Sequence, residues 1–564
     1  MTRNLVARIE VLIIVLFACI PLMLSLPYRV NIFLSWEGAY RMSGGQLPFR
    51  DFGVPLGGMY WVIPAIFFKL FGPAMITLVK AQVFINILAG LSFRSILRSL
   101  SVDPGIRFAS VLLFCLSYSF FNFWPWYNHS VIVYELIALA CLFRYLFPRD
   151  GANGGRYHLV WLAGAAFFTC CSVLTKQDGG GLAFLVACWV LTIDGLLRKK
   201  WLPLVIYAGS FIVLMLLLVL PFLSHGFGYW FNHGQPPHSS RVSLFDILNE
   251  LLGGSIWLKF YLFVIILLSV VRWRLPADLR GDRAVVLLVA LTIGVLGEAA
   301  VLQVTSYTPP DNNIFFHSFG FACVFSLLSP LLAGRVAKPG TILVLCLGIF
   351  FWWSGVWWGY GQRMLARFMP GRETARQSPT GENVVNRETY AIVTDTPRVK
   401  EIPQDQWVEC GLRAFRKITM PIPTAEGIRR LLAMEPISSY RQGRHPGEPP
   451  GNIRVLNMSE LTPLAAEVPF SLEANPQLPL WYHLGVGMFN RQADSFETRI
   501  RAHYYDLVLF EYIPTLNNFY PFRVRDSLRL HYAQVDSFPA PRRGVETQGV
   551  VEVFVRPADT LTGR

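Results

Sequence analysis

Long apolar runs alternate with short polar segments from the start of the chain to about residue 358. Runs of about 17–25 residues are long enough to cross a bilayer core of roughly 30 Å as helices. The first run lacks a small-residue cleavage site after it, so we expect it to be retained. We predict eleven spans, near 8–27, 73–93, 104–123, 130–147, 157–175, 182–197, 201–223, 256–271, 284–307, 314–333 and 340–358.

One further apolar segment, GGMYWVIPAIFFKLFG at 57–72, is too short to span and carries Pro64 and Lys69. It is typical of a helix lying at the membrane interface. With this segment not counted as a span and the N-terminus inside, seventeen Lys and Arg residues fall in inner segments and six in outer ones. Because cytoplasmic loops are enriched in Lys and Arg, this bias predicts a cytoplasmic N-terminus and an outer face for everything after residue 358.

The pattern changes after residue 358, where Pro and charged residues occur throughout. Short β-rich runs alternate with helical patterns, which predicts an α/β domain, and about 200 residues can bury their own core. We therefore expect a transmembrane domain at 1–358, including a first outer loop at 28–72, and a soluble domain at 359–564. The strands are expected at 391–395, 453–458, 505–512 and 550–556, and the helices at 424–434 and 522–532.

The composition agrees with a membrane protein. The 564 residues are 53% hydrophobic and 15% charged, which is too apolar for a soluble chain. Much of the net charge of +14 lies between the apolar runs, and no basic patch with stacking aromatics predicts nucleic-acid binding. Eight of nine cysteines lie in or beside apolar runs, and Cys410 is alone in the tail. We therefore expect no disulfide within the tail and no metal site.

Three ionisable residues, Lys80, Glu135 and Glu298, fall in the outer halves of predicted spans. Such residues are costly in a bilayer and usually line a cavity or pathway. Because all three lie in the outer half of the membrane, they indicate a polar cavity that opens outward. The alternative is snorkelling of the lysine and hydrogen bonding of the two glutamates between helices.

The first outer loop is the most informative segment for chemistry. It places two acids, Glu37 and Asp51, in a Gly- and Pro-rich stretch beside the membrane. Either carboxylate could take a proton from an acceptor hydroxyl as a general base. Arg50 could bind a phosphate through two parallel hydrogen bonds. The alternative is a charged surface loop without a chemical role.

The loop carries a longer motif in three parts. It begins with EGAY at 37–40, an acid, Gly, any residue and Tyr, and continues with GGQLPFRDF at 44–52. A predicted helix that ends in KLFG at 69–72 follows. This motif resembles the first outer loop of GT-C glycosyltransferases, including protein mannosyltransferase and lipid A aminoarabinose transferase relatives. The resemblance is clear over 28–100 and looser at 126–139 and 174–180. It implies a polyprenyl-phosphate-linked sugar donor, reaction on the outer face and a loop acid as catalytic base.

The chain departs from these relatives at the start of the loop. Many of them have Asp–Glu there, whereas this sequence has Trp36–Glu37. In the family the first acid is the one usually assigned to catalysis. Three interpretations follow: Glu37 is the base, Asp51 is the base, or the standard activity has been lost.

Further candidate ligands lie at the outer ends of later spans. Lys176, Gln177 and Asp178 precede Gly179–Gly181, where a helix N-terminus and the lysine would favour a lipid phosphate. Lys80 is a further phosphate candidate. The alternative for Lys176 is an interfacial lysine before a Gly-rich turn.

Two more outer loops hold polar candidates. Tyr127, Asn128 and His129 form a short loop that could bind sugar hydroxyls. The loop at 224–241 contains three histidines whose spacing fits no metal-ligand pair. We expect it to cover the donor site, with His233 and Arg241 as substrate ligands, or to be an ordinary polar loop. A last outer turn adds Asp311, Asn312, Asn313 and His317 as cavity-lining candidates.

The sequence therefore predicts a polytopic α-helical, GT-C-like membrane protein with a C-terminal α/β domain. Its expected activity is sugar transfer from a polyprenyl-phosphate donor to a hydroxyl on a glycan, lipid or protein, at a bacterial inner membrane. No nucleotide, redox or metal cofactor is expected. Two alternatives stay open: a lipid or solute transporter, and a non-catalytic relative acting in binding or assembly.

Overall fold

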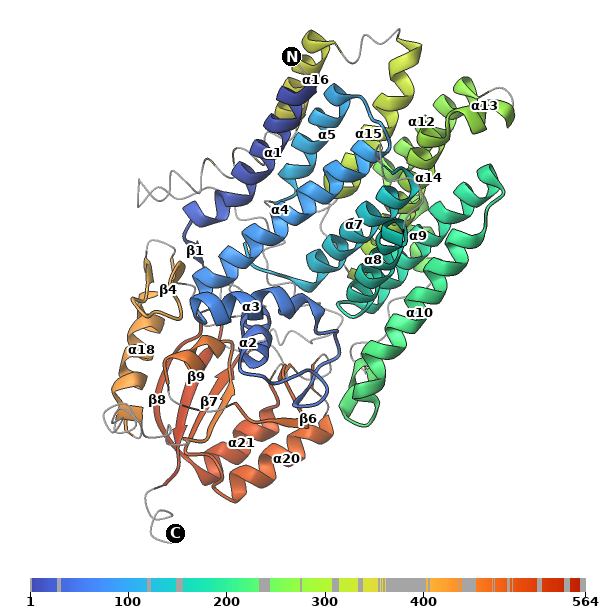
Figure 1. Ribbon diagram of the computed structural model, residues 1–564. Helices are drawn as coiled ribbons and strands as arrows, with labels where there is room; N and C mark the ends of the chain where they lie inside the picture. The colour runs from blue at the N-terminus through green and yellow to red at the C-terminus, as the bar shows by residue number, and fades with distance from the viewer. Residues whose placement is uncertain are drawn as a thin grey trace. The chain divides into compact units, whose positions relative to one another are not determined.

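The protein divides into two compact units, which we call the helical unit (residues 1–21, 82–221 and 241–361) and the mixed unit (22–81, 222–240 and 362–564). The elements are shown in the ribbon diagram of the computed structural model (Figure 1). The structure describes residues 3–27, 32–118, 123–148, 156–232, 244–273, 276–306, 314–332, 338–352, 356, 358, 361, 402–403, 406–435, 437–438, 453–468, 470, 472–483, 487–488, 490–514, 520–541 and 548–557.

Apolar helices build the helical unit, and in the described residues six helices are long and apolar enough to cross a membrane: Leu5–Met23, Met75–Ser99, Tyr127–Leu146, Gln177–Arg198, Leu202–Leu223 and Arg283–Thr305. Helix α4 starts in the mixed unit and continues into this one. The helices are α1 (Arg3–Cys19), α4 (Met75–Ser99), α5 (Pro104–Leu116), α7 (Tyr127–Leu146), α8 (Arg156–Val173), α9 (Gln177–Arg198), α10 (Leu202–Leu223), α11 (Leu244–Asn249), α12 (Ile256–Arg272), α13 (Pro276–Gly281), α14 (Arg283–Ser306), α15 (Ile314–Leu331) and α16 (Pro339–Trp352).

A helix lies at each of the eleven predicted span positions. The segment at 57–72 forms a short 3₁₀ turn, Met59–Trp61, and helix α3, Val62–Phe71. The 10 residues of α3 are about 15 Å long at 1.5 Å per residue, half the thickness of a bilayer core. This length agrees with the prediction that the segment does not span. Its position at a membrane interface stays a prediction.

Two helices begin earlier than their predicted spans. Helix α7 begins at Tyr127, so the outer loop expected at 127–129 is wrong. Helix α9 begins at Gln177, so Gly179–Gly181 lie in its first turns, which agrees with the expected helix N-terminus and not with the alternative of a Gly-rich turn. The glycines of α9 have a packing role. A Cβ on Gly180 would lie 2.2 Å from the backbone of Val173, and one on Gly179 would lie 2.9 Å from Val131. Small residues of this kind let α9 approach α8 and α7 closely.

One buried acid ties three helices together at the start of the helical unit. Glu10 of α1 is fully buried and pairs with Arg94 of α4 at 2.6 Å and with Arg107 of α5 at 2.9 Å. With a cation on each carboxylate oxygen, this buried charge is compensated.

The tail is an α/β structure within the mixed unit. Its four-stranded sheet has the order β5 (Val455–Met458), β7 (Leu507–Tyr512), β9 (Val550–Val555), β8 (Ala533–Pro539). Strand β5 is parallel to β7, and the other neighbours are antiparallel. Side chains of the sheet and of α20 (Asn490–Arg501) and α21 (Phe522–His531) share one hydrophobic core. The remaining tail elements are β3 (Trp407–Glu409), β4 (Ile418–Pro421), α18 (Ile422–Ala433), a 3₁₀ turn (Thr462–Ala466) and β6 (Asn475–Pro479).

Segments of the first outer loop pair directly with the tail. Strand β1 (Leu26–Pro27) lies parallel to β4, and β2 (Phe52–Gly53) lies parallel to β6. Between them, helix α2 (Ile32–Ser43) belongs to the same unit. The boundary drawn at 358/359 from the sequence did not anticipate this pairing.

The structure confirms the predicted fold class of apolar helices followed by a C-terminal α/β region. Strands β5, β7 and β9 and helices α18 and α21 lie where the sequence predicted them. The strand expected at 391–395 lies outside the described residues. Helix α20 and strands β3, β4, β6 and β8 of the tail were not predicted.

Candidate functional site

Helix α2 places Glu37 and holds Trp36 in the core. The Trp36 side chain is fully buried and stacks on Tyr40 at 4.6 Å between ring centroids. Gly38 is required next to it, because a Cβ there would lie 2.0 Å from the Trp61 indole. Trp61 in turn donates a hydrogen bond of 2.9 Å to the Leu34 carbonyl. Trp36 is therefore a packing residue.

Glu37 lies one residue further, on a helix rather than in an open loop, and is 5% exposed. Arg41, one turn along α2, donates a hydrogen bond of 3.0 Å from Nε to Glu37 Oε1, and its terminal nitrogen forms an ion pair with the same oxygen at 2.9 Å. No donor to Glu37 Oε2 exists in the described part of the chain. Burial raises the pKa of Glu37 above its ordinary value of 4.5, and the charge and hydrogen bonds of Arg41 offset this only in part. A raised pKa favours proton uptake by this carboxylate.

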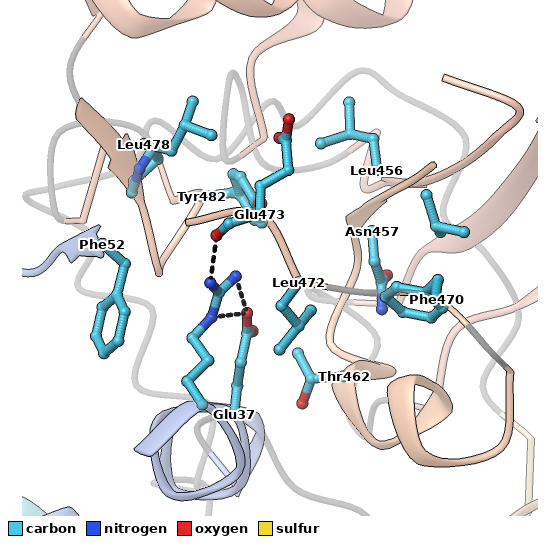
Figure 2. Close-up of a pocket in the computed structure, with 13 residues that line it drawn as sticks. Glu37, Phe52, Leu456, Asn457, Thr462, Phe470, Leu472, Glu473, Leu478 and Tyr482 are labelled. Carbon is cyan, nitrogen blue, oxygen red and sulfur yellow. Dashed lines mark hydrogen bonds and ion pairs between the residues drawn. The ribbon is translucent and has the colours of Figure 1, made fainter. Parts of the chain in front are cut away.

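Glu37 and Arg41 line a pocket of the mixed unit (Figure 2). The other walls come from the tail, around β5, the segment 470–473 and β6. Figure 2 shows Asn457, Glu473 and Tyr482 around the same space. All lining residues belong to one compact unit, so the pocket is a property of that unit.

Asp51 has a different setting, in the turn before β2. Its Oδ2 accepts hydrogen bonds from the Leu47 backbone N–H at 2.7 Å and from Arg50 at 2.6 and 2.9 Å. Although partial burial opposes it, the Arg50 guanidinium and the Leu47 N–H hold the pKa of Asp51 below its ordinary value. Arg50 also donates to the Gly45 carbonyl at 2.9 Å. The Arg50–Asp51 pair closes the turn, and neither residue lines the pocket.

The two lysine candidates also differ. Lys80 is exposed on α4, in the mixed unit, with its ammonium 4.9 Å from the centroid of the Phe71 ring. Lys176 is the N-cap of α9 in the helical unit, 9% exposed, and its ammonium lies 3.0 Å from the Asp178 carboxylate. Asp178 also accepts a hydrogen bond of 2.8 Å from the Gly179 N–H. The Asp178 carboxylate therefore already binds the Lys176 ammonium and one N–H group of the helix N-terminus, which are the groups predicted to bind a phosphate.

The remaining sugar-binding candidates, Tyr127, Asn128, His129 and Gln177, all lie in the helical unit, and one contact joins Tyr127 to Lys176. Lys176 lies 6.0 Å from the ring centroid of Tyr127. Asn128 is half-buried, and its Oδ1 has no hydrogen-bond partner within the described residues. His129 is buried, with its Nδ1 3.4 Å from Gln82 Nε2. Gln177 occupies the first position of α9, between Lys176 and Asp178.

The acids inside the spans are deeply buried. Glu135 of α7 and Glu298 of α14 are each 2% exposed, and none of their carboxylate oxygens has a hydrogen-bond partner within the described residues. The hydrogen bonding between helices that was the alternative is therefore not seen for these two acids in that part of the chain. The outward-opening cavity that they and Lys80 indicated from the sequence stays a prediction.

Several loop candidates fall outside the described residues: His233, His238, Arg241, Asp311, Asn312 and Asn313. His225 is exposed beside Ser224, and His317 lies 3.3 Å from the Tyr261 hydroxyl. Within the described ranges no group of three or more His, Cys, Asp and Glu could hold a metal ion.

The tail residues of the pocket were missed by sequence reasoning. Arg41 is bound through its NH1 to the Gln46 side chain at 3.0 Å and to the Glu473 carbonyl at 2.8 Å. Glu473 and Tyr482 lie more than 400 positions from Glu37 along the chain. No local spacing in the sequence connects them. The only usable signal was the Glu–x–x–x–Arg spacing of Glu37 and Arg41, which predicts an ion pair on one helix face.

No family model matches the sequence, and no curated protein matches it. Among solved structures, the chain is similar to ArnT from Cupriavidus metallidurans in the apo state, with a TM-score of 0.44, and to the same protein bound to undecaprenyl phosphate, with a TM-score of 0.40. Each alignment has 12% identity and covers 97% of both chains. At these values the likeness assigns no reaction, substrate or site residue, and the fold class stated above rests on the chain's own helices and strands.

Proposed function

We propose that this protein is a GT-C-type membrane glycosyltransferase that moves a sugar from a polyprenyl-phosphate donor to a hydroxyl acceptor. The first outer loop motif, the apolar helices and the α/β tail support this class. The bacterial inner membrane is the proposed location, with the N-terminus in the cytoplasm and the tail outside.

The observation that carries the proposal is the setting of Glu37. It is the acid at the start of the loop, one of its oxygens is held by Arg41, and its carboxylate lines a pocket. Its raised pKa suits a general base, because a base works best with a pKa near the operating pH. Asp51 is also held by an arginine, but it does not line the pocket and its pKa is lowered. We therefore assign the base to Glu37 and a structural role to Asp51.

In the proposed reaction, the acceptor hydroxyl gives its proton to Glu37 while its oxygen forms a bond to the anomeric carbon. The bond from that carbon to the phosphate oxygen breaks, and polyprenyl phosphate leaves. Lys176 is the proposed phosphate ligand, with Arg50 and Lys80 as the other candidates. A cation there stabilises the charge that develops on the leaving group. Tyr127, Asn128, His129, Gln177 and Asp178 are the proposed sugar contacts.

Mass spectrometry of cells with and without the gene tests the activity. We expect a polyprenyl-phosphate sugar to accumulate in the deletion strain and that sugar to disappear from an envelope glycan, lipid or protein. Restoring the gene should reverse both changes. Unaltered lipid-linked sugars together with unaltered envelope glycans would contradict the proposal.

Cysteine labelling from outside intact cells tests the topology. Cysteines introduced near positions 45 and 450 should react, and those near 150 and 278 should not. Labelling at 278 without labelling at 450 would reverse the orientation that we propose.

One observation favours a second function, a non-catalytic binding or assembly subunit. Trp36 is a fully buried packing residue at the position where many relatives have an acid. In that case the deletion strain would accumulate no lipid-linked sugar, and Glu37→Gln would support the same growth and the same glycans as the natural sequence.

A further inference from the structure

Two consecutive backbone carbonyls of the tail, at Leu472 and Glu473, accept hydrogen bonds from side chains of the first outer loop. Gln46 donates a bond of 2.9 Å to the first, and Arg41 donates a bond of 2.8 Å to the second. Figure 2 marks the bond to Glu473 with a dashed line. Both residues precede β6 and lie outside helices and strands, so their carbonyls need partners of this kind. The tail therefore takes part in holding the loop.

Arg41, which binds the tail, also holds the proposed base. Its Nε donates a hydrogen bond of 3.0 Å to Glu37 Oε1, and its Nη2 forms an ion pair with the same oxygen at 2.9 Å. Its Nη1 donates to the Glu473 carbonyl and to the Gln46 side chain. Because a guanidinium is a rigid plane, acceptors that fix one of its edges also fix the edge that faces the carboxylate. The orientation of Glu37 thus depends on the position of a tail carbonyl.

The side chain of Glu473 is anchored in turn. Both oxygens of its carboxylate accept hydrogen bonds from Arg499 of α20, at 2.7 and 2.9 Å. Helix α20 is fixed in the tail, because Phe496 and Ile500 are fully buried in its hydrophobic core. A chain of contacts therefore runs from this core through Arg499 and Glu473 to Arg41.

A second arginine pair of the tail provides a comparison. Arg430 of α18 donates two hydrogen bonds to Asp536 of β8, at 2.9 and 3.1 Å, and is 52% exposed. Arg499 is 27% exposed, and the backbone of its partner Glu473 binds the first outer loop. Exposed pairs contribute little to stability. The two arginines make similar bonds, but the bonds of Arg499 lead to Glu37.

We propose that Arg499 is a positioning residue for the transfer reaction: through Glu473 and Arg41 it holds the Glu37 carboxylate in the orientation that accepts the proton. This inference rests on the proposed function, because it gives the held carboxylate the role of the base. A catalytic group works only when it is held within about 0.5 Å of its productive position. A link outside the reacting groups can therefore change the rate.

Transfer kinetics of Arg499→Met and Arg430→Met test the proposal. Each change removes one arginine from a pair with two hydrogen bonds in the tail. Without Arg499 the Glu473 carbonyl is held less firmly, so kcat should fall about tenfold or more, with the donor KM nearly unchanged. Arg430→Met should keep the kcat of the natural sequence. Equal kcat values for the two variants would overturn the proposal.

Glu473→Met breaks the same link from the other side and covers the case in which Arg499→Met does not fold. The two changes alter the charge near Glu37 in opposite directions, yet both free the carbonyl that binds Arg41. We expect a similar loss of kcat in both, and no further loss in the double variant, because the two residues act as one unit. Opposite effects on kcat would mean that charge acts instead of position, and would overturn the proposal.

The pH dependence of kcat/KM separates positioning from a smaller amount of folded protein. Burial raises the pKa of Glu37, and Arg41 lowers it. The other titratable residues that line the pocket are Glu473 and Tyr482. The double variant Arg499→Met/Glu473→Met leaves the net charge unchanged but holds Arg41 less firmly. The pKa of Glu37 should therefore rise further and move the acid limb to higher pH. A lower profile with the limb in place would overturn the proposal.

Backbone hydrogen exchange of residues 37–46 tests the chain of contacts without any transfer reaction. Exchange there should be faster in Arg499→Met than in the natural sequence, and unchanged in Arg430→Met. Unchanged exchange in both variants would overturn the proposal.

A Glu37→Gln background separates this proposal from the proposed function. Once the base is gone, Arg499→Met should lower the residual rate no further. A further tenfold loss would overturn the positioning role and leave Glu37 as the base. Full transfer by Glu37→Gln alone would contradict the catalytic assignment, and with it the positioning of a base by Arg499, whereas the chain of contacts would still be judged by hydrogen exchange.

Discussion

Helix α2 and the turn before β2 both pair an acid with an arginine, yet the two pairs have opposite properties. Glu37 is 5% exposed and Arg41 6%. Arg50 is 42% exposed, and its Asp51 partner also accepts a backbone N–H. The pKa of Glu37 is raised by burial, whereas the hydrogen bonds of Asp51 outweigh its partial burial and lower its pKa.

The difference shows that pairing with arginine does not by itself decide what an acid can do. In water an exposed pair is screened, and its acid remains a weak base. In a buried pocket the loss of hydration keeps the proton affinity of the carboxylate high even beside a cation. The sequence presents Glu37 and Asp51 as equivalent loop acids, and their surroundings separate them.

The largest expected effect is on catalysis at Glu37. Glu37→Gln keeps the size of the side chain but removes the base, so transfer should fall by about 10²–10⁴-fold. Donor binding should survive, because the proposed phosphate ligands lie elsewhere in the chain. The rate of polyprenyl phosphate release from a lipid-linked donor, in membranes of the deletion strain, measures the first effect. Retention of labelled undecaprenyl phosphate by the purified protein measures the second.

The next largest effect is on stability. Arg41→Met leaves Glu37 buried without its cation, and breaking such a pair typically costs about 3–5 kcal/mol. The matched change Arg50→Met breaks an exposed pair and should cost about 1 kcal/mol or less. Denaturant unfolding of both variants in detergent compares the two costs. Similar costs would mean that the two pairs do not differ as described.

A third pair extends the comparison into the helical unit. The Lys176 ammonium lies 3.0 Å from the Asp178 carboxylate. Lys176→Ala should raise the donor KM about tenfold, with expression near normal. Lys199→Ala, an exposed lysine at the other end of α9, is the control. An unchanged donor KM and kcat in Lys176→Ala would rule Lys176 out as the phosphate ligand.

The dependence of transfer on pH gives a smaller effect. Glu37 accepts a proton only when ionised, so kcat/KM should fall as the pH falls through its pKa. Because that pKa is raised, the acid limb should lie above the ordinary value of 4.5. Asp51→Asn should leave this limb where it is. A limb below pH 4.5 would be inconsistent with a buried base.

The smallest expected effect is that of Asp51→Asn itself. It removes an ion pair whose arginine is 42% exposed, and we expect a loss of about 1 kcal/mol or less with little change in kcat. Fully folded but inactive Asp51→Asn protein would reverse the roles assigned to the two acids.

The positions of the helices could be predicted because crossing a membrane requires long apolar runs. At the start of α9 the sequence left two readings open, a helix N-terminus or a turn, and the close approach of Val173 and Val131 to Gly180 and Gly179 explains why the helix includes these glycines. Helix α20 (NRQADSFETRIR) is too polar to stand out in the sequence, although its apolar face packs into the tail core.

The sequence identified Glu37 but not its surroundings. Its ion pair with Arg41 has a local signal in the spacing of four residues. The pocket does not, because Asn457, Glu473 and Tyr482 reach Glu37 only through the pairing of the first outer loop with the tail. Trp36 was visible in the sequence as a departure from the motif that the loop resembles, and its role in packing depends on Gly38 and Trp61.

Chemical rescue tests the central claim most directly. Glu37→Ala and Asp51→Ala are assayed for transfer with increasing formate, a small carboxylate that can occupy the space of a missing side chain. We predict that Glu37→Ala is nearly inactive alone and that formate restores transfer with saturation, whereas Asp51→Ala is active and does not respond. Transfer by Glu37→Ala at the full rate without formate, with a folded but inactive Asp51→Ala, would contradict the assignment of Glu37 as the base.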